Sequence, residues 1–588
     1  MAFADETPTR TEGETGATVD TEGRLAFVER YPFEARMVRY SFLVSFLALA
    51  VGGLFGVIQA LHRTGIYRGF VSNADYYTVL TGHGVLLVLV FTTFFIAGLF
   101  LWAVTSSLDR EVPSQRVTKL WFWLMLVGTL MAGTAIVGGF SDLIPASATV
   151  LFTFYAPLQA SPIFYIGAAL IIVGSWIAGL NYFRTFYAWK RDNPDERIPL
   201  QTFMVLTTML MWYIATIGVA VEVVFFLIPW SLGLISEVDP LLTRTLFWFF
   251  GHPVVYFWLM PAYLVWYTIL PKLSGGRLFS DSLARIVFVL FLLLSTPTGF
   301  HHQYVDPGIP EGYKFVAMTN TMFLLLPSLL TAFTVVASME HGARQRGGTG
   351  LFGWLKALPW DNPAFSGCAL AGMMFAAAGF SGMVNAGMNL NYLVHNTLWV
   401  PGHFHLTVGT AFALTAMAIS YWLVPQITGK PLGLRKWASA QPFVWFIGML
   451  LMSNAMHRAG LVGVPRRTAV PQYDQFSYES VFGTYGEMRI QIAIGGTLLF
   501  VALVMFLMVM WDTYMGTRGG RLSVSSRIPE PLSGAAASPK VLDRIWLWFA
   551  IAFLLVLLAY GLPLYDFVSD GVFSPGSPAY PAFSWLGL

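Results

Sequence analysis

The sequence has little charge and almost no cysteine. Only 11% of its 588 residues are Asp, Glu, Lys or Arg, whereas a typical soluble domain carries roughly 25%. The single cysteine, Cys368, excludes a disulfide framework and any thiolate cluster that takes two ligands from this chain. The formal net charge of +3 is too small to indicate a nucleic-acid partner.

Long apolar runs take the place of charge. Hydrophobic residues make up 56% of the chain, and the mean hydropathy is +0.63. Because a helix needs about 20 apolar residues to cross a bilayer, these runs predict an all-α, polytopic bundle of about thirteen transmembrane helices. The expected spans are 39–61, 78–106, 118–141, 147–182, 201–231, 242–271, 283–300, 313–339, 365–386, 391–425, 441–463, 488–511 and 541–568.

Lysine and arginine are concentrated in alternate loops, which predicts the orientation. Cytoplasmic loops carry the excess of positive residues, and the loops that follow the second, fourth and sixth expected spans are rich in them. We therefore expect a polar cytoplasmic N-terminal tail (1–36), a single transmembrane domain (37–568) and an outer C-terminal tail (569–588). Arg466 and Arg467 go against the trend, because they fall in an outer loop.

Two histidines lie one residue apart at the start of a long apolar run, in Trp399-Val-Pro-Gly-His403-Phe-His405. Residues two apart on a helix lie about 200° round its axis, so these side chains leave opposite faces at nearly the same depth. Imidazole is the commonest side-chain metal ligand. The pair could hold a metal group on each face, or it could be two structural polar groups in the bundle, and the other histidines decide between these interpretations.

Four further histidines fall in the same outer layer of the membrane once the orientation is fixed. They are His83, His252, His301 and His302. Ionisable residues at membrane depth are costly and mark functional sites, so six imidazoles from four spans predict metal or cofactor binding. His395 lies near the same layer and could support a bound group.

Six imidazoles can be divided among three metal groups. Two on facing helices suit a six-coordinate, electron-carrying haem, one suits a five-coordinate haem with an open face, and three suit a copper ion with a vacant position. This division uses all six. The outer pair Arg466-Arg467 is placed to bind haem propionates.

At this point the residues resemble subunit I of the haem–copper oxidases, over nearly the whole chain. The resemblance is carried by His83, Gly251-His252-Pro-Val-Val-Tyr256, His301-His302 and His403-Phe-His405. The stretches 257–263, 295–302 and 400–405 are similar to the ba-type, or B-class, cytochrome c oxidases.

The resemblance implies the catalytic subunit of a respiratory terminal oxidase, which reduces O2 to water with four electrons and couples the reaction to proton uptake and translocation. The implied groups are a b-type low-spin haem on His83 and His405, an a-type high-spin haem on His403, and copper B on His252, His301 and His302. It also implies a covalent bond between Tyr256 and His252, which their i, i+4 spacing on a helix allows.

Other chemistries on this scaffold remain as alternatives. Nitric oxide reductases replace the copper by a non-haem iron and lack the tyrosine, and cbb-type oxidases carry it on another helix, so Tyr256 favours the ba-type oxidase. The A-class enzymes have a glutamate where this chain has Val254. A non-enzymatic haem transporter would need only the haem ligands, and the His301-His302 pair argues against it.

A polar stripe could carry protons inward of the histidine layer. Tyr256, Tyr263 and Tyr267 lie on one face of the sixth expected span, and Tyr267 lies about 16 Å inward of Tyr256 at 1.5 Å per residue. The eighth span offers Ser328, Thr331 and Thr334 in its inner half. Ordinary hydrogen bonding between membrane helices would explain the same residues, whereas the resemblance to B-class enzymes favours a proton path.

The resemblance also implies partners and a location. A single cysteine is too few for a dinuclear copper centre, so a subunit II that carries one is implied, with cytochrome c or a blue-copper protein as electron donor and a possible small single-helix subunit. The chain is expected in a prokaryotic plasma membrane, with its N-terminus inside and its C-terminus outside. Asn391 stands where relatives have aspartate, so we assign it no catalytic role.

Overall fold

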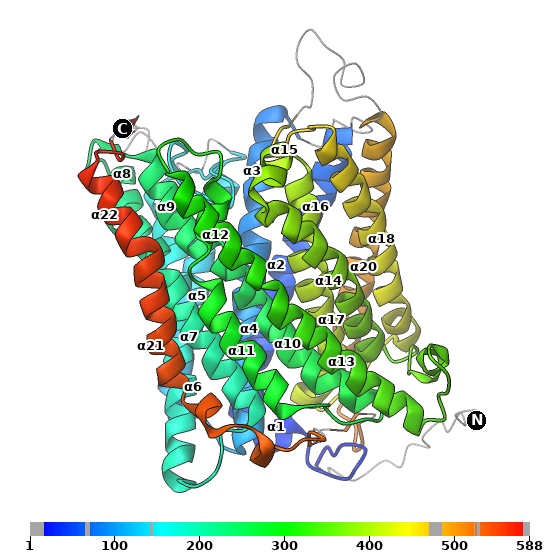
Figure 1. Cartoon of the computed structure of the whole chain (residues 1–588). Coiled ribbons are helices and arrows are strands. Elements are labelled where there is room, and N and C mark those ends of the chain that lie inside the picture. The colour runs from blue at the N-terminus through cyan, green and yellow to red at the C-terminus, as the bar shows by residue number, and fades with distance from the viewer. Residues whose placement is uncertain are drawn as a thin grey trace.

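The computed structural model describes residues 17–64, 71–141, 144, 146–469, 485–522, 524–525, 530–574 and 576–579 of the chain. Long helices lie side by side in one bundle and run between its two ends (Figure 1). The two short strands, β1 (Glu237–Val238) and β2 (Ser577–Pro578), pair antiparallel with each other. The prediction of an all-α bundle is confirmed.

The α-helices follow one another along the whole described chain. They are α1 (Phe27–Arg30), α2 (Pro32–Thr64), α3 (Asn73–Val85), α4 (Thr92–Leu108), α5 (Gln115–Gly138), α6 (Pro162–Asp192), α7 (Leu200–Val221), α8 (Ile228–Ser231), α9 (Pro240–Gly251), α10 (Pro253–Leu273), α11 (Asp281–Ser295), α12 (Glu311–Phe323), α13 (Leu325–Gln345), α14 (Pro363–Ala386), α15 (Met388–Val394), α16 (Trp399–Leu406), α17 (Ala413–Thr428), α18 (Arg435–Leu461), α20 (Tyr485–Met515), α21 (Ile545–Val556) and α22 (Leu562–Ser569). The π-helices are η1 (Leu86–Phe91), η2 (Glu222–Leu227), η5 (Thr407–Phe412) and η8 (Leu557–Gly561), and the 3-10 helices are η3 (Gly299–Gln303), η4 (Gly353–Ala357), η6 (Ala535–Ala537) and η7 (Lys540–Asp543).

Within the described ranges, 11 helical stretches are long and apolar enough to cross a membrane. Two more of the predicted spans are present as α11, which is short at 15 residues, and α18, which carries polar side chains such as Gln441, Asn454 and His457. Together they account for about thirteen helices, as predicted, and the chain is a multi-pass membrane protein.

Three predicted spans differ from the helices that form. The span predicted at 147–182 becomes helical only at Pro162, where α6 begins. The span predicted at 283–300 ends at Ser295, and the two histidines that follow lie in the 3-10 helix η3. The span predicted to start at 391 is interrupted, because α15 ends at Val394 and α16 begins only at Trp399. Asn396 has a positive φ of 58° at this break, a conformation that asparagine tolerates better than most residues.

Two helices that carry histidines change their winding directly after them. The π-helix η1 begins three residues after His83, and η5 begins two residues after His405. A π-helical turn inserts an extra residue and is frequent at functional sites. The π-helical turns therefore indicate that both helices contribute to a functional site.

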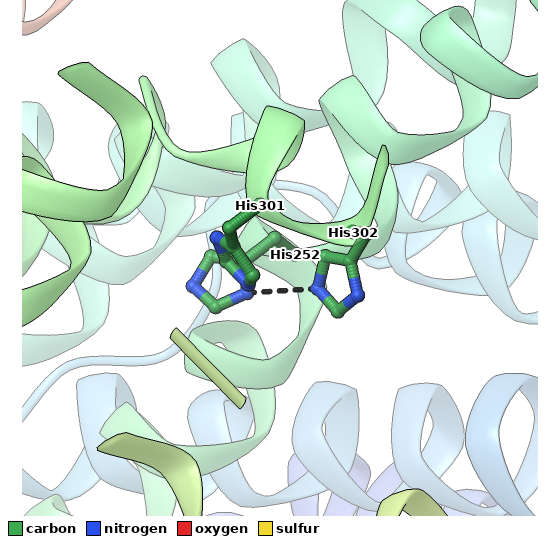
Figure 2. A group of neighbouring side chains, drawn as sticks. All are labelled: His252, His301 and His302. Atoms are coloured by element: carbon green, nitrogen blue, oxygen red, sulfur yellow. Dashed lines mark hydrogen bonds between the residues drawn. The ribbon is translucent and has the colours of Figure 1, made fainter. Parts of the chain in front are cut away.

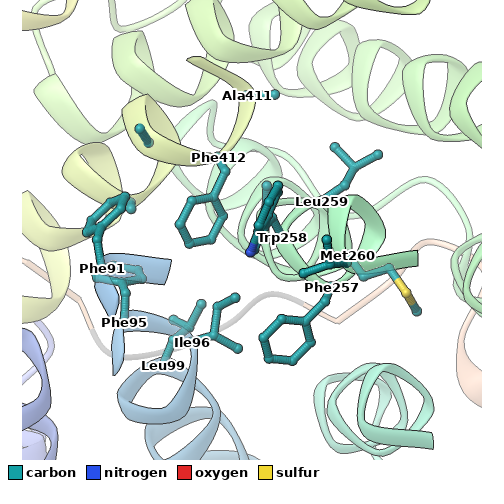
Figure 3. Packing of buried hydrophobic residues seen from close by; sticks show 14 of the residues in the cluster. Phe91, Phe95, Ile96, Leu99, Phe257, Trp258, Leu259, Met260, Ala411 and Phe412 are labelled. Carbon is teal, nitrogen blue, oxygen red and sulfur yellow. The ribbon is translucent and has the colours of Figure 1, made fainter. Parts of the chain in front are cut away.

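An aromatic core joins the helices that carry these histidines (Figure 3). Phe412 in η5 contacts Phe91 in η1 and Phe95 in α4, at ring-centre distances of 5.7 and 6.1 Å. All three side chains are buried, as is Trp258 in α10. Such aromatic packing holds α4, α10 and η5 in a fixed arrangement around the interior.

The structure describes part of the predicted N-terminal tail and part of the predicted C-terminal tail. Val19 forms bridges with Leu25 and Arg521, so the N-terminal segment from residue 17 onward lies against the connection before α21. Residues 1–16 of the predicted N-terminal tail lie outside the described residues, as do residues 575 and 580–588 of the predicted C-terminal tail. In the latter, Ser577 and Pro578 form β2.

Candidate metal centre

A cavity of about 570 Å³ lies inside the bundle and is walled mainly by apolar and aromatic side chains. Its size and character are those of a pocket for a cofactor or small ligand. All six of the predicted ligand histidines line it: His83, His252, His301, His302, His403 and His405. The structure therefore brings together imidazoles from four separate parts of the sequence.

Three of these histidines form a compact cluster (Figure 2). One ligand nitrogen from each of His252, His301 and His302 lies within 4.8 Å of the others, and His252 Nδ1 lies 3.2 Å from His302 Nε2. His252 stands at the junction of α9 and α10, and the other two come from η3. Three converging neutral imidazoles suit a copper ion that keeps an open coordination position.

Neighbouring side chains orient two members of the cluster. The Thr321 hydroxyl donates to Ala317 O (2.6 Å), so its oxygen can accept the hydrogen of His301 Nδ1 at 3.1 Å. This leaves His301 Nε2 free to bind a metal. The ring of Trp248 stacks on His302 at 3.9 Å with an angle of 8° between the planes.

Tyr256 lies beside the cluster, as the i, i+4 spacing predicts. Its hydroxyl oxygen is 3.1 Å from His252 Nε2. Because His252 Nδ1 faces His302, the two nitrogens of the His252 ring face different partners. The imidazole of His252 therefore lies between the histidine cluster and the phenol of Tyr256.

His83 and His405 face each other across the cavity. Their ring centres are 6.2 Å apart and their planes differ by 20°. Each Nδ1 donates its hydrogen to a backbone carbonyl, of Gly52 (2.8 Å) and of Pro401 (2.7 Å), which directs both Nε2 lone pairs inward. With metal–nitrogen bonds of about 2 Å, two imidazoles on opposite sides of one ion need ring centres about 6 Å apart. The pair thus fits a haem iron between its rings.

His403 points to the other side of α16, as its spacing from His405 predicts. Its Nδ1 lies 3.0 Å from Ser381 Oγ, and the Ser381 hydroxyl donates to Ala378 O at 3.0 Å. The serine oxygen is therefore the acceptor, and His403 Nε2 is left free. A Cβ at Gly382 would approach within 3.0 Å of the His403 ring, so the absence of a side chain at Gly382 provides the space that the ring occupies. One free imidazole at the cavity wall fits a five-coordinate haem.

The predicted propionate partners gather at one end of the cavity. Arg466, Arg467 and His395 all line it, and Arg466 is held by Asn396 Oδ1 at 2.9 Å. Burial, together with the positive charges of Arg466, Arg244 and Arg467, lowers the pKa of His395 to about 4. The cluster thus presents two guanidinium groups beside a neutral imidazole, which suits carboxylates.

The predicted polar stripe is paired across α10 and α13. Tyr263 donates to Ser328 Oγ at 3.1 Å, and the hydroxyl oxygens of Tyr267 and Thr331 lie 2.7 Å apart. Thr334 follows one turn further along α13 and bonds to the carbonyl of Leu330. Two inter-helical hydrogen bonds therefore lie in register along this helix pair.

Sequence reasoning missed the residues that orient the histidines. Thr321, Ser381 and Trp248 were not among the predicted site residues, although all three contact predicted ligands. The available signal was slight, namely a hydroxyl or an indole in a mostly apolar helix. Thr and Ser of this kind are common in membrane bundles, where they bond to their own helix.

Comparisons with known proteins agree with this geometry. The family described as cytochrome c and quinol oxidase polypeptide I matches residues 36–498. Cytochrome c oxidase subunit 1 of Thermus thermophilus is 42% identical over 548 residues, which cover 91% of this chain and 94% of the relative. Cytochrome c oxidase polypeptide 1 of Halobacterium salinarum is 26% identical and covers 73% and 71% of the two chains.

A solved structure leads to the same family. A cryo-EM structure of a heme-copper terminal oxidase dimer superposes with a TM-score of 0.86 at 37% identity, covering 93% of this chain and 95% of the other. The sequence match, the shared fold and the six converging histidines are consistent with one another. This chain belongs to the family of cytochrome c and quinol oxidase polypeptide I, the subunit I of haem–copper terminal oxidases.

Proposed function

We propose that this chain is the catalytic subunit of a ba-type cytochrome c oxidase. The family implies haems and copper B, which when bound transfer four electrons to O2 and reduce it to water. The observation that carries the proposal is the cluster of His252, His301 and His302 beside Tyr256, at the wall of a cavity that also receives His403. The phenol of Tyr256 is placed to lend a proton and an electron to this centre.

Each remaining histidine receives one role in the proposal. His83 and His405 ligate the low-spin, b-type haem, and their inward Nε2 atoms support this assignment. His403 ligates the high-spin, a-type haem from the other face of α16. Arg466, Arg467 and His395 bind the haem propionates.

Protons reach the centre through the stripe between α10 and α13. The proposed path comprises Tyr263, Ser328, Tyr267, Thr331 and Thr334. Hydroxyl groups that bond to one another can pass a proton along by exchanging donor and acceptor roles. Uptake from one side to a centre near the other moves charge across the membrane, so the chemistry is coupled to proton translocation.

A valine at position 331 tests the path. Thr331→Val keeps the shape of the side chain and removes the hydroxyl that meets Tyr267, so O2 consumption should slow while the haem spectrum stays unchanged. Thr319→Val is a matched control, because Thr319 is exposed on α12 and bonds only to its own helix. Equal turnover in both variants and the unmodified enzyme would exclude this path.

The proposal includes partners and an orientation. A subunit II that carries a dinuclear copper centre delivers electrons, with cytochrome c or a blue-copper protein as donor, and a small single-helix subunit can complete the complex. The protein lies in a prokaryotic plasma membrane with its N-terminal side in the cytoplasm. The positions of α1 and α22 at opposite ends of the bundle support termini on opposite sides (Figure 1).

Metal analysis with optical spectra tests the whole assignment. The purified subunit should contain two haem irons and one copper, and one of the two haems should bind CO in the reduced state. Copper replaced by a non-haem iron would identify a nitric oxide reductase. Absence of copper together with absence of O2 consumption would overturn the proposal and favour a non-enzymatic haem transporter.

A further inference from the structure

The last helical stretch, Ile545–Ser569, lies outside the residues that the family description matches, which end at 498. It comprises α21, η8 and α22 and runs along the edge of the bundle (Figure 1). About half of its residues are exposed, as expected for a helix with one face against lipid, whereas Tyr560 is only 2% exposed. The large side chain of Tyr560 is therefore directed into the protein, as is that of Phe567 (1% exposed).

The ring of Tyr560 lies against the neighbours of two proposed copper ligands. It stacks on Phe300 at 4.9 Å with an angle of 26°, and it meets Phe249 at 4.5 Å. Phe300 immediately precedes His301 in η3, and Phe249 lies three residues before His252. A single ring thus touches both of the elements that supply the histidine cluster.

The start of η3, at Gly299, is tightly packed. A Cβ at Gly299 would overlap both the hydroxyl of Tyr560 and the carbonyl oxygen of Trp248. The start of η3 is therefore enclosed between the last helix on one side and α9 on the other. Because the Trp248 ring also stacks on His302, a displacement at Gly299 would reach the ligands directly.

Contacts at both ends fix the helix that carries Tyr560. At one end Asp543, just before α21, pairs with Arg197 and with Arg285, each at 2.7 Å. Near the other end Phe567 meets Phe300 at 6.2 Å, edge to face. A helix anchored at both ends can act as a rigid support for what lies at its middle.

We propose that Tyr560 is a positioning residue for the copper site, and that the last helix holds the turn of His301 and His302 in place. Tyr560 acts through Phe300 and Gly299 and does not contact a ligand itself. The inference rests on the proposed copper ligation by the three histidines. It makes a segment beyond the matched family region a working part of the metal centre.

The test compares two tyrosines of the same helical stretch in the purified complex. Tyr560→Leu removes the aromatic contact, and Tyr565→Leu is the matched control because Tyr565 is 72% exposed. The readouts are the copper content and the stretching vibration of carbon monoxide after light has released it from the reduced haem onto the copper. Tyr560→Leu should shift or broaden the vibration and lower the copper content by about two-fold or more, while the control matches the unmodified enzyme.

Further variants separate positioning from general damage. The optical spectrum of the low-spin haem should stay unchanged in Tyr560→Leu, because His83 and His405 lie on other helices. Tyr560→Phe retains the ring and should restore the normal vibration. Gly299→Ala adds one methyl group that meets both the Tyr560 hydroxyl and the Trp248 carbonyl oxygen, so it tests how tightly the start of η3 is enclosed and should also shift the vibration.

The outcomes are decisive in either direction. A normal vibration and full copper content in Tyr560→Leu would overturn the positioning role. If Tyr560→Leu fails to assemble, Tyr560→Met, which keeps more of the side-chain volume without the ring, decides by the same readout. An unmodified complex without copper would overturn the proposed function, and this inference with it, whereas unaltered variants of a copper-containing enzyme overturn the inference alone.

Discussion

The two sides of the cavity hold their imidazoles by different means. On one side, His83 and His405 are oriented by backbone carbonyls, of Gly52 and Pro401. These acceptors belong to the helices themselves, and no side-chain substitution removes them. The pair is therefore fixed as soon as α2, α3 and α16 reach their places in the bundle.

On the other side, side chains do the orienting. His403 faces the hydroxyl of Ser381 and His301 that of Thr321, at 3.0 and 3.1 Å. His302 lies under the ring of Trp248. The backbone thus builds the side proposed to carry electrons, whereas the side proposed to bind O2 depends on side chains that single substitutions can alter.

The largest effect is expected where a ligand itself is removed. His405→Ala should eliminate the low-spin haem and lower O2 consumption by more than about 100-fold, since no neighbouring imidazole can take its place. The histidine cluster stands on other elements, α9, α10 and η3, so the copper content should not change. Iron and copper analysis of the purified variant measures both quantities. Loss of copper along with the haem would show that the two sides do not assemble independently.

A smaller effect is expected from Ser381→Ala, which leaves every ligand in place. Without the serine oxygen, the hydrogen of His403 Nδ1 lacks its acceptor and the ring loses its fixed orientation. Loss of such a partner typically costs 10- to 100-fold in metal affinity or activity, so we expect turnover to fall by about 10-fold. The absorption of the CO-binding haem should change while that of the low-spin haem does not.

Ser366→Ala provides the control for this prediction. Ser366 is fully buried on the same helix, and its hydroxyl donates to the carbonyl of Asn362. It therefore matches Ser381 in helix, burial and backbone bond, and differs in lacking an imidazole partner among the contacts described. Equal losses in both variants would show that burial of the hydroxyl, and not orientation of His403, determines the effect.

The same contrast explains how much could be predicted from the sequence. The six ligand candidates could be found because depth follows from span order, and because two histidines two residues apart must leave opposite faces of a helix. The tyrosine stripe on α10 follows from the same periodicity, whereas its association with residues of α13 rested on the resemblance to B-class oxidases. The break between Val394 and Trp399 was missed although the sequence carries a signal there, because His395-Asn396-Thr397 interrupts the apolar run and asparagine tolerates a positive φ.

The orienting hydroxyls were beyond prediction for a physical reason. Thr321 and Ser381 both donate to a carbonyl of their own helix, of Ala317 and Ala378, as Ser and Thr in membrane helices generally do. Only the second interaction, in which the oxygen accepts from a histidine on another element, distinguishes them. That interaction depends on tertiary structure, and no local pattern reports it.

The smallest effect is expected at Thr321. It allows a comparison between the two hydroxyl groups that orient histidines, Thr321 beside His301 and Ser381 beside His403. Thr321→Val removes the acceptor for His301 Nδ1 much as Ser381→Ala does for His403. His301, however, shares its proposed metal with two other imidazoles, and its ring already meets that of His252 edge to face at 4.1 Å. We therefore expect turnover to fall by only about 2- to 5-fold and copper to be lost faster to a chelator. The control is Thr319→Val, two residues earlier on the exposed face of α12. A loss as large as that of Ser381→Ala would mean that one misaligned imidazole in three disables the cluster, and that the three histidines act as a single unit.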